Sequence, residues 1–212
     1  YGARDHSWGI RSTMGPHLPI RGVEPEAARD PRAIRIWVPF EAGHLTGFFH
    51  THEGPRGETL DFQGTLWDDG DEVPLTGVRH AFRYDDGTRR LAGGEFTLLD
   101  AGGGERRFTF ERVCEPVHPE GFGYARGWSD GGNPGVWRGP EVIESSSFDA
   151  TDPDAAPGGA HLPAARRLGG TEFACSLAGP GGETGMAHVE HMIYGTYEPS
   201  GFVGPNPWQL GD

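Results

Sequence analysis

Short segments of alternating polar and apolar residues, separated by turns rich in glycine and aspartate, run through the middle of this chain. Ile34, Ile36 and Val38 fall on one face of such a segment, the pattern of a half-buried strand. Asp68-Asp69-Gly70-Asp71 and Asp86-Gly87 have the composition of tight turns between antiparallel strands. The pattern predicts an all-β fold with little helix, closed as an antiparallel lipocalin-like barrel or strongly curved as a sandwich.

The expected strands can be placed from the same alternation. They are residues 33–40, 45–52, 58–67, 78–84, 91–99, 107–113, 171–177 and 186–197. In the third of these, Leu60, Phe62, Gly64 and Leu66 are expected to point inward. We expect a single lipocalin-like β domain over residues 1–212, as the C-terminal part of a longer two-domain protein. Residues 145–163 are polar and rich in Asp, Pro and Ala, and are expected to form a long exposed loop.

Composition excludes several classes of function. The net charge is -13, which argues against nucleic acid and anionic membranes as partners. All 18 basic residues are Arg, so Schiff-base catalysis and lysine-dependent phosphate loops are excluded. No apolar run is long enough for a transmembrane helix, and we expect no membrane insertion. Cys114 and Cys175 form no CxxC pair; two free thiols in a cytoplasmic protein are expected, with a single disulfide left open.

The opening stretch places a carboxylate, an imidazole and an indole within four residues. On a strand, His6 and Trp8 share one face, and a bulge would bring Asp5 round to join them. A buried carboxylic acid can donate a proton, and an indole face can stabilise a carbocation. We therefore predict Asp5 as the acid, His6 as its partner or the base for water, and Trp8 as the cation stabiliser. The plainer interpretation pairs Asp5 with a nearby Arg and buries Trp8 in the core.

This opening motif, Asp5-His6-Ser7-Trp8-Gly9, resembles one in the carotenoid 1,2-hydratase (hydroxyneurosporene synthase) superfamily. Gly121-Phe122-Gly123-Tyr124, Gly135-Val136-Trp137-Arg138-Gly139 and Val189-Glu190-His191-Met192-Ile193-Tyr194-Gly195 resemble later segments in an uncharacterised bacterial branch. The resemblance implies the second of two lipocalin-like domains, and it carries over His6 and Trp8 as site residues. Its hydratases add water to an isolated alkene without a cofactor, and related fungal pericyclases form decalin rings. The resemblance also implies a preceding domain, which we expect to form one wall of a shared cavity.

Two histidines share one face of the second expected strand. His50 and His52 have the spacing of metal ligands, but a cupin would have an acidic residue where Arg56 or Gly57 stands. We interpret them as substrate-binding imidazoles that line a pocket, and we assign no metal ligand. A metal completed by His6 or His191 across the barrel, and two exposed strand-end histidines, are the alternatives.

The last expected strand carries a third group of polar residues. Glu190 and Tyr194 share one face with His188, and His191 lies on the other. Because a late strand of a closed barrel lies beside the first, Glu190 or His191 would come near His6. The aromatic residues Tyr124, Trp128 and Trp137 are expected to line the same hydrophobic cavity, with ordinary core packing as the alternative. Together with His50 and His52, these residues form the predicted substrate-binding set.

We therefore expect a cofactor-independent lyase or isomerase, of hydratase, dehydratase or cyclase type. Its substrate would be an apolar, isoprenoid- or polyketide-like small molecule. A missing N-terminal domain or a partner chain is expected to complete the site, and a homodimer is left open. The alternatives are a non-catalytic lipocalin-like binder of a hydrophobic molecule and a metal-dependent enzyme that uses the His-x-His strand.

Overall fold

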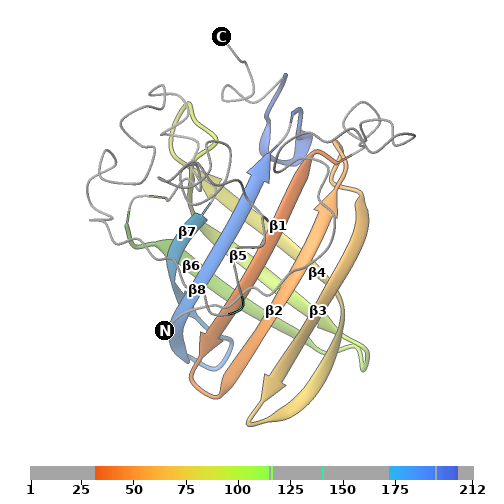
Figure 1. The fold of residues 1–212 in the computed structure, drawn as a ribbon, viewed down its shortest axis with the longest axis vertical. Coiled ribbons are helices and arrows are strands. Elements are labelled where there is room, and N and C mark those ends of the chain that lie inside the picture. The colour runs from red at the N-terminus through yellow and green to blue at the C-terminus, as the bar shows by residue number, and fades with distance from the viewer. Residues whose placement is uncertain (1–31, 115, 117–139, 141–171, 194, 205–212) are drawn as a thin grey trace.

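The computed structural model describes residues 32–114, 116, 140, 172–193 and 195–204. Within these ranges, eight strands follow one another around a closed ring, each antiparallel to its neighbours, and the last pairs with the first (Figure 1). They are β1 (Ile34–Ala42), β2 (Leu45–Glu53), β3 (Thr59–Asp68), β4 (Asp71–Tyr84), β5 (Leu91–Asp100), β6 (Glu105–Arg112), β7 (Glu172–Ala178) and β8 (Thr184–Ile193). The all-β, antiparallel prediction is confirmed, and the closed sheet is lipocalin-like in shape.

The two ends of the ring differ in how the strands are joined. At one end, here called the hairpin end, short turns join β1 to β2, β3 to β4, β5 to β6 and β7 to β8. Asp69 and Gly70 have φ of 50° and 91°, the left-handed pair that a tight hairpin turn requires. The opposite end, here called the connection end, carries the β2–β3 loop, the β4–β5 turn and residues 195–204.

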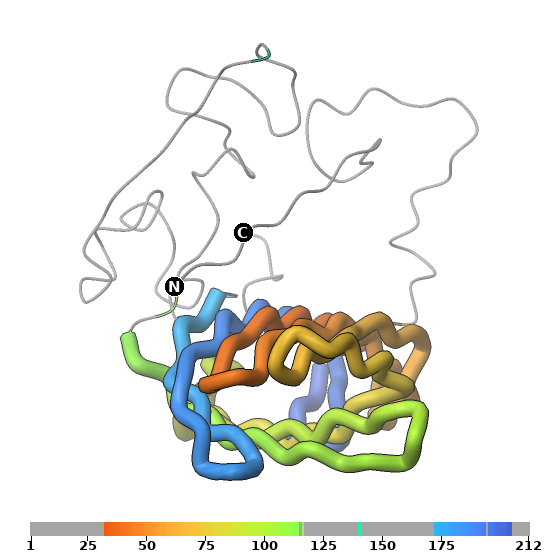
Figure 2. Tube along the Cα trace, turned by 90° about the horizontal axis from the view of Figure 1, so that it is seen from below, coloured from red at the N-terminus to blue at the C-terminus, as the bar shows by residue number. Residues whose placement is uncertain are grey.

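The ring is flattened into two layers because two of its seams are short. β3 pairs with β4 only from Thr65 to Asp68, and β6 pairs with β7 only from Thr109 to Arg112. The strands β7, β8, β1, β2 and β3 form one layer, and β4, β5 and β6 cross behind it, as the view in Figure 2 shows. Side chains that point between the layers are therefore enclosed on both sides.

Three details of the predicted strands are wrong. β4 begins at Asp71 rather than residue 78, because Pro74 and Gly77 interrupt the alternation without ending the strand. Leu60 is 40% exposed, not inward, because it is the extra residue of a bulge where the β2–β3 register shifts. The last strand ends at Ile193 rather than Tyr197, which forms an isolated bridge with Phe202.

Phenylalanine rings fill the middle of the barrel and its hairpin end. Phe96 stacks on Phe108 with the ring centroids 5.0 Å apart and the planes inclined by 18°. Phe40 and Phe49 pack against this pair from the other layer, with centroid distances of 5.0 and 5.1 Å. All four side chains are fully buried, so this half of the interior is a packed apolar core.

Residues 195–204, here called the cap, close over the connection end. The cap contains the single turn η3 (Glu198–Ser200) and the bridge between Tyr197 and Phe202. Arg89, in the β4–β5 turn, donates hydrogen bonds to the carbonyl oxygens of Gly195 and Gly204 at 2.8 and 2.9 Å. Its guanidinium also lies 5.0 Å from the centre of the Phe202 ring. The cap is thus attached to the rim by backbone-directed hydrogen bonds and a cation–π contact.

In the part of the chain that the structure describes, no helix is both long and apolar enough to span a bilayer. Cys114 and Cys175 are both free thiols, as expected, and burial raises the pKa of Cys175 to about 12. Several predictions lie outside the described residues. They concern the opening motif with Asp5, His6 and Trp8, the aromatic residues Tyr124, Trp128, Trp137 and Tyr194, and the expected loop 145–163.

Candidate functional site

Five titratable side chains meet inside the barrel at its connection end. We call Glu53, His80, Tyr84, His191 and Tyr197 the interior polar cluster. Strand alternation turns Glu53, His80, Tyr84 and His191 inward, and the cap contributes Tyr197. The group is unusual because ionisable side chains are rarely buried without a partner or a function.

A carboxylate lies between an imidazole and a phenol in one half of the cluster. His80 Nε2 is 2.8 Å from Glu53 Oε1, and the Tyr197 hydroxyl donates to Glu53 Oε2 at 2.5 Å. Burial alone would raise the pKa of Glu53. The hydrogen bonds and charge of His80, together with the Tyr197 hydroxyl, outweigh burial and hold this pKa below its usual value. Glu53 is therefore a carboxylate, and burial together with this neighbour raises the pKa of Tyr197.

A phenol and an imidazole form the other half. The Tyr84 hydroxyl lies 2.9 Å from His191 Nε2. Burial lowers the pKa of His191 to about 3, with the charge of His80 as a smaller cause, so the ring is neutral near pH 7. Burial also raises the pKa of Tyr84. A neutral imidazole has one acceptor nitrogen, so the Tyr84 hydroxyl can donate a hydrogen bond to Nε2 of the ring.

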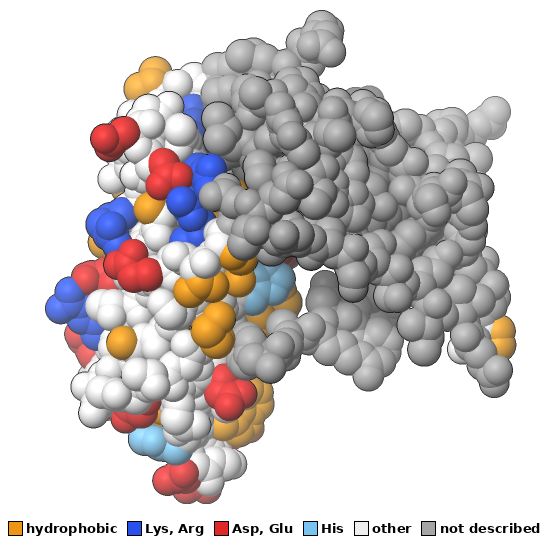
Figure 3. All heavy atoms as spheres, turned by 90° about the vertical axis from the view of Figure 1, so that its left-hand side faces the viewer, with side chains coloured by type: hydrophobic (Ala, Val, Ile, Leu, Met, Phe, Trp, Pro, Cys, Tyr) orange, Lys and Arg blue, Asp and Glu red, His pale blue; other side chains and the backbone are white. Residues whose placement is uncertain are grey.

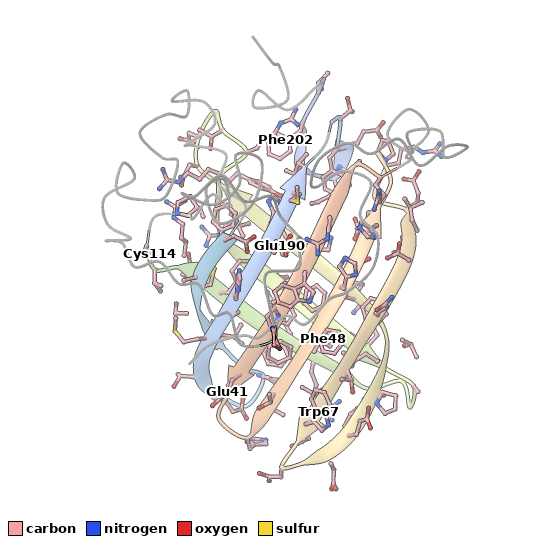
Figure 4. The ribbon with its side chains drawn as sticks, in the orientation of Figure 1. Glu41, Phe48, Trp67, Cys114, Glu190 and Phe202 are labelled. Atoms are coloured by element: carbon pink, nitrogen blue, oxygen red, sulfur yellow. The ribbon has the colours of Figure 1, made fainter. Side chains whose placement is uncertain are left out.

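Aromatic rings pack against the interior polar cluster. Phe82 contacts both imidazoles, with ring centroids 4.6 Å from His80 and 5.8 Å from His191. On the cap side, Phe202 meets the Tyr84 ring edge-on at 4.8 Å. Phe202 is labelled at the upper end of the barrel in Figure 4, at the opposite end from Glu41. The surroundings are apolar, which strengthens electrostatic interactions within the cluster.

This arrangement supplies the parts of acid–base chemistry. One carboxylate can hold and orient an imidazolium, a neutral imidazole can accept a proton, and two phenols can donate hydrogen bonds to a developing negative charge. All of them lie in an enclosed, apolar setting that the cap separates from the surface. A substrate would have to enter at the cap, since phenylalanine rings fill the interior below the cluster.

The predicted substrate-binding residues fall on opposite sides of the sheet. His191 points inward and belongs to the interior polar cluster. His50, His52 and Glu190 lie on the outer face of the β8–β1–β2 layer, where Glu190 forms an ion pair with Arg35 (Figure 4). The barrel wall therefore lies between these three residues and His191.

A second group of titratable residues lies on that outer face. We call His50, His52 and Asp61 the outer histidine cluster. His52 Nδ1 lies 2.9 Å from Asp61 Oδ2, and the two imidazole centroids are 4.7 Å apart. Burial, followed by the charge of Arg35, lowers the pKa of His50 to about 4. Elsewhere on the described surface, acidic and basic side chains lie side by side (Figure 3).

Sequence reasoning missed four members of the interior polar cluster. His80 and Tyr84 lie within the expected strand 78–84 and share a face with Val78 and Phe82, but an imidazole and a phenol on an apolar face carry no distinctive motif. Glu53 is the last residue of β2, and the metal-like spacing of His50 and His52 on this strand points to the opposite face. Tyr197 reaches the site from the cap. The sequence signal that could have revealed part of the site is the alternation along β4, which puts His80 and Tyr84 on one face of the strand.

Most of the chain matches one known protein family. A family model for DUF8625, a family of unknown function, matches residues 1–203. Among curated proteins, none matches the chain. The chain belongs to DUF8625.

Proposed function

We propose that this DUF8625 protein is a cofactor-independent lyase or isomerase. It would use the interior polar cluster for acid–base chemistry on an apolar, isoprenoid- or polyketide-like small molecule. The observation that carries the proposal is the meeting of a carboxylate, two imidazoles and two phenols inside an otherwise apolar barrel. Such clusters of perturbed titratable groups are typical of catalytic sites.

The geometry suggests a division of roles. Glu53 orients the His80 ring through the contact between Oε1 and Nε2, and His80 is assigned the role of proton donor on this geometry. His191 is neutral and accepts a proton from the substrate or from water. The hydroxyl groups of Tyr84 and Tyr197, whose pKa values are raised, contact His191 and Glu53 in the structure. In the reaction they would turn to donate hydrogen bonds to a substrate oxygen that gains negative charge, and this would free Nε2 of His191 to accept a proton. Removal of a proton from one carbon and delivery of a proton to another moves a double bond. Removal of a proton from one carbon and delivery of a proton to a hydroxyl group on the next carbon releases water and leaves a double bond.

The sequence resemblance supports the same class of reaction. In the carotenoid 1,2-hydratase superfamily, water adds to an alkene without a cofactor, and the opening motif with Asp5, His6 and Trp8 carries that resemblance. In this proposal, those residues would contribute the stronger acid that protonation of an isolated alkene requires. An N-terminal domain or partner chain would complete the wall of the site.

A second candidate is a non-catalytic binder of a hydrophobic molecule. The observation that favours it is the internal pairing of the cluster, since Glu53 and Tyr84 already have hydrogen-bond partners among the described residues. A paired cluster of this kind can stabilise a barrel end without doing chemistry.

Metabolite comparison with a matched pair of variants tests the proposal. A strain lacking the gene is complemented with the wild-type gene, with Glu53→Gln, or with Glu95→Gln. The last variant removes the carboxylate of an exposed ion pair between Glu95 on β5 and Arg107 on β6. Lipophilic extracts are compared by mass spectrometry. We expect the deletion strain and the Glu53→Gln strain to accumulate the same compound. The wild-type and Glu95→Gln strains should convert it into an isomer or a product that differs by one water.

Two outcomes would overturn the enzyme proposal. In one, Glu53→Gln protein accumulates to normal levels and restores the wild-type extract. In the other, a lipophilic compound co-purifies with wild-type protein and is unchanged in mass and structure on incubation. That second result favours the binder.

A further inference from the structure

We propose that the outer histidine cluster, His50, His52 and Asp61, is a binding site for a divalent transition-metal ion such as Zn²⁺. This site is separate from the interior polar cluster and lies on the other side of the barrel wall. It does not depend on the proposed acid–base function.

Strand geometry brings the three ligands together. His50 and His52 are two residues apart on β2 and project from the same face, and Asp61 of β3 is the register partner of His52. One ligand atom from each residue lies within 4.8 Å of the others. Small side-chain rotations bring such atoms to the metal–ligand distances of about 2.0–2.2 Å found for histidine and carboxylate. The ligands come from a rigid sheet rather than from loops.

The donor atoms are suited to a metal. His50 Nε2 is buried and, among the residues that the structure describes, has no hydrogen-bond partner, although buried nitrogens almost always have one. Asp61 is about half exposed, with 52% of its side chain accessible, so the site is open to solvent on one side. Three protein ligands and an open position are the pattern of a site that retains a water molecule.

Asp61 supplies the negative charge among the three proposed ligands. Arg35 lies nearby, and its guanidinium forms an ion pair with Glu190 across the β1–β8 seam. This pairing offsets the repulsion that Arg35 would exert on a cation. Arg32, whose Nη1 lies 3.4 Å from His52 Nε2, adds a second positive charge beside the site, which a bound cation would have to displace. Asp61 interacts directly with His52, which holds the carboxylate toward the imidazoles.

The ligand set selects the type of metal. Two imidazoles and one carboxylate suit zinc, cobalt, nickel or iron, whereas calcium and magnesium require oxygen ligands. Sequence spacing alone pointed away from this site, because a cupin would have its acidic residue where Arg56 or Gly57 stands. The ligand lies instead on the neighbouring strand, nine positions further along the chain.

Zinc titration of the full chain tests the site. Protein stripped with a chelator is titrated with Zn²⁺ against a competing indicator, and Co²⁺ absorption reports the coordination. Asp61→Asn is the main variant, since its exposed side chain can change without loss of packing. We expect it to weaken Zn²⁺ binding at least about 100-fold, because loss of an outer-sphere partner alone costs about 10- to 100-fold.

The matched control uses another histidine–aspartate pair of the same layer. His44 Nε2 lies 3.3 Å from Asp68 Oδ1, without a second imidazole beside it, so His44→Gln should leave Zn²⁺ affinity unchanged. His50→Gln should reproduce the Asp61→Asn loss if the latter variant folds poorly. The proposal is overturned if wild type binds no zinc, if both cluster variants bind zinc like wild type, or if His44→Gln causes an equal loss.

Discussion

The two ends of the barrel interior are built from the same strands but filled in opposite ways. At the hairpin end, Phe96 and Phe108 stack, and Phe40 packs against both at a tilt, with no titratable group among the three rings. At the connection end, β2, β4 and β8 of the same ring carry Glu53, His80 and His191 into the interior, under a cap held by Arg89.

This difference separates stability from chemistry. Phenylalanine packing lowers the free energy of the folded state through burial and dispersion. Buried titratable groups gain little net free energy, since hydrogen bonding must first offset their desolvation. The hairpin end is therefore expected to hold the fold together, and the connection end to carry the function.

Removal of a ring from the hairpin end should have the largest effect on stability. Phe96→Ala leaves a cavity beside Phe40, Phe49 and Phe108, and is expected to lower the free energy of unfolding by about 3–5 kcal/mol. Urea denaturation followed by tryptophan fluorescence measures the change. If Phe96→Ala lowered the free energy of unfolding by less than a variant of the interior polar cluster does, the proposed division between the two ends would be wrong.

Loss of the carboxylate charge at the connection end should have a smaller effect. Glu53→Gln keeps the size of the side chain but weakens its charged hydrogen bonds with His80 and Tyr197. We expect about 1.5–3 kcal/mol less stability, the range for hydrogen bonds to charged groups. The same urea experiment applies, with Glu95→Gln as the exposed control. Equal stability of Glu53→Gln and wild type would show that the buried pair contributes nothing to the fold.

Stability should fall as the solution becomes acidic. Burial lowers the pKa of His191 to about 3, so below about pH 6.5 the unfolded chain binds a proton that the folded protein does not. The free energy of unfolding therefore decreases from about pH 6.5 downward. His50, whose pKa is lowered to about 4, adds to the same trend. In urea midpoints measured against pH, His191→Phe should flatten the decline, and an unchanged slope would argue against a neutral buried ring.

Detachment of the cap should have the smallest effect on the whole fold and a clear local one. Arg89→Ala removes hydrogen bonds to Gly195 and Gly204 and the contact with Phe202. We expect faster amide exchange confined to residues 195–204 and a global loss of about 1 kcal/mol. Arg79→Ala, from an exposed ion pair with Glu105, serves as the control. Uniform exchange changes throughout the barrel would contradict a separately held cap.

The fold was accessible from sequence because barrel strands repeat a simple signal. Alternation gave the inward faces of β1 and β6, and Asp-Gly or Gly-rich turns marked the hairpins. The errors arose where tertiary pairing overrides local pattern. Pro74 and Gly77 interrupt alternation inside a continuous strand, and the bulge at Leu60 turns an apolar side chain outward.

The site was less accessible because its members come from three strands, β2, β4 and β8, and the cap. Alternation showed that His188 and His191 face opposite ways, but it could not say which face was the interior. Pairing with β1 decides this, since His191 is the register partner of Ile36, whose side chain is fully buried. A single strand therefore reveals the two faces, and only the closed ring reveals which groups meet.

NMR of the imidazole rings, assigned by substitution and followed across pH, tests most directly whether the connection end encloses a dry acid–base cluster. We predict that the His191 ring stays neutral from about pH 8 to about pH 5. Protonation of His191 with a midpoint near the ordinary value of about 6.5 would show that water reaches the ring, and the account would be wrong.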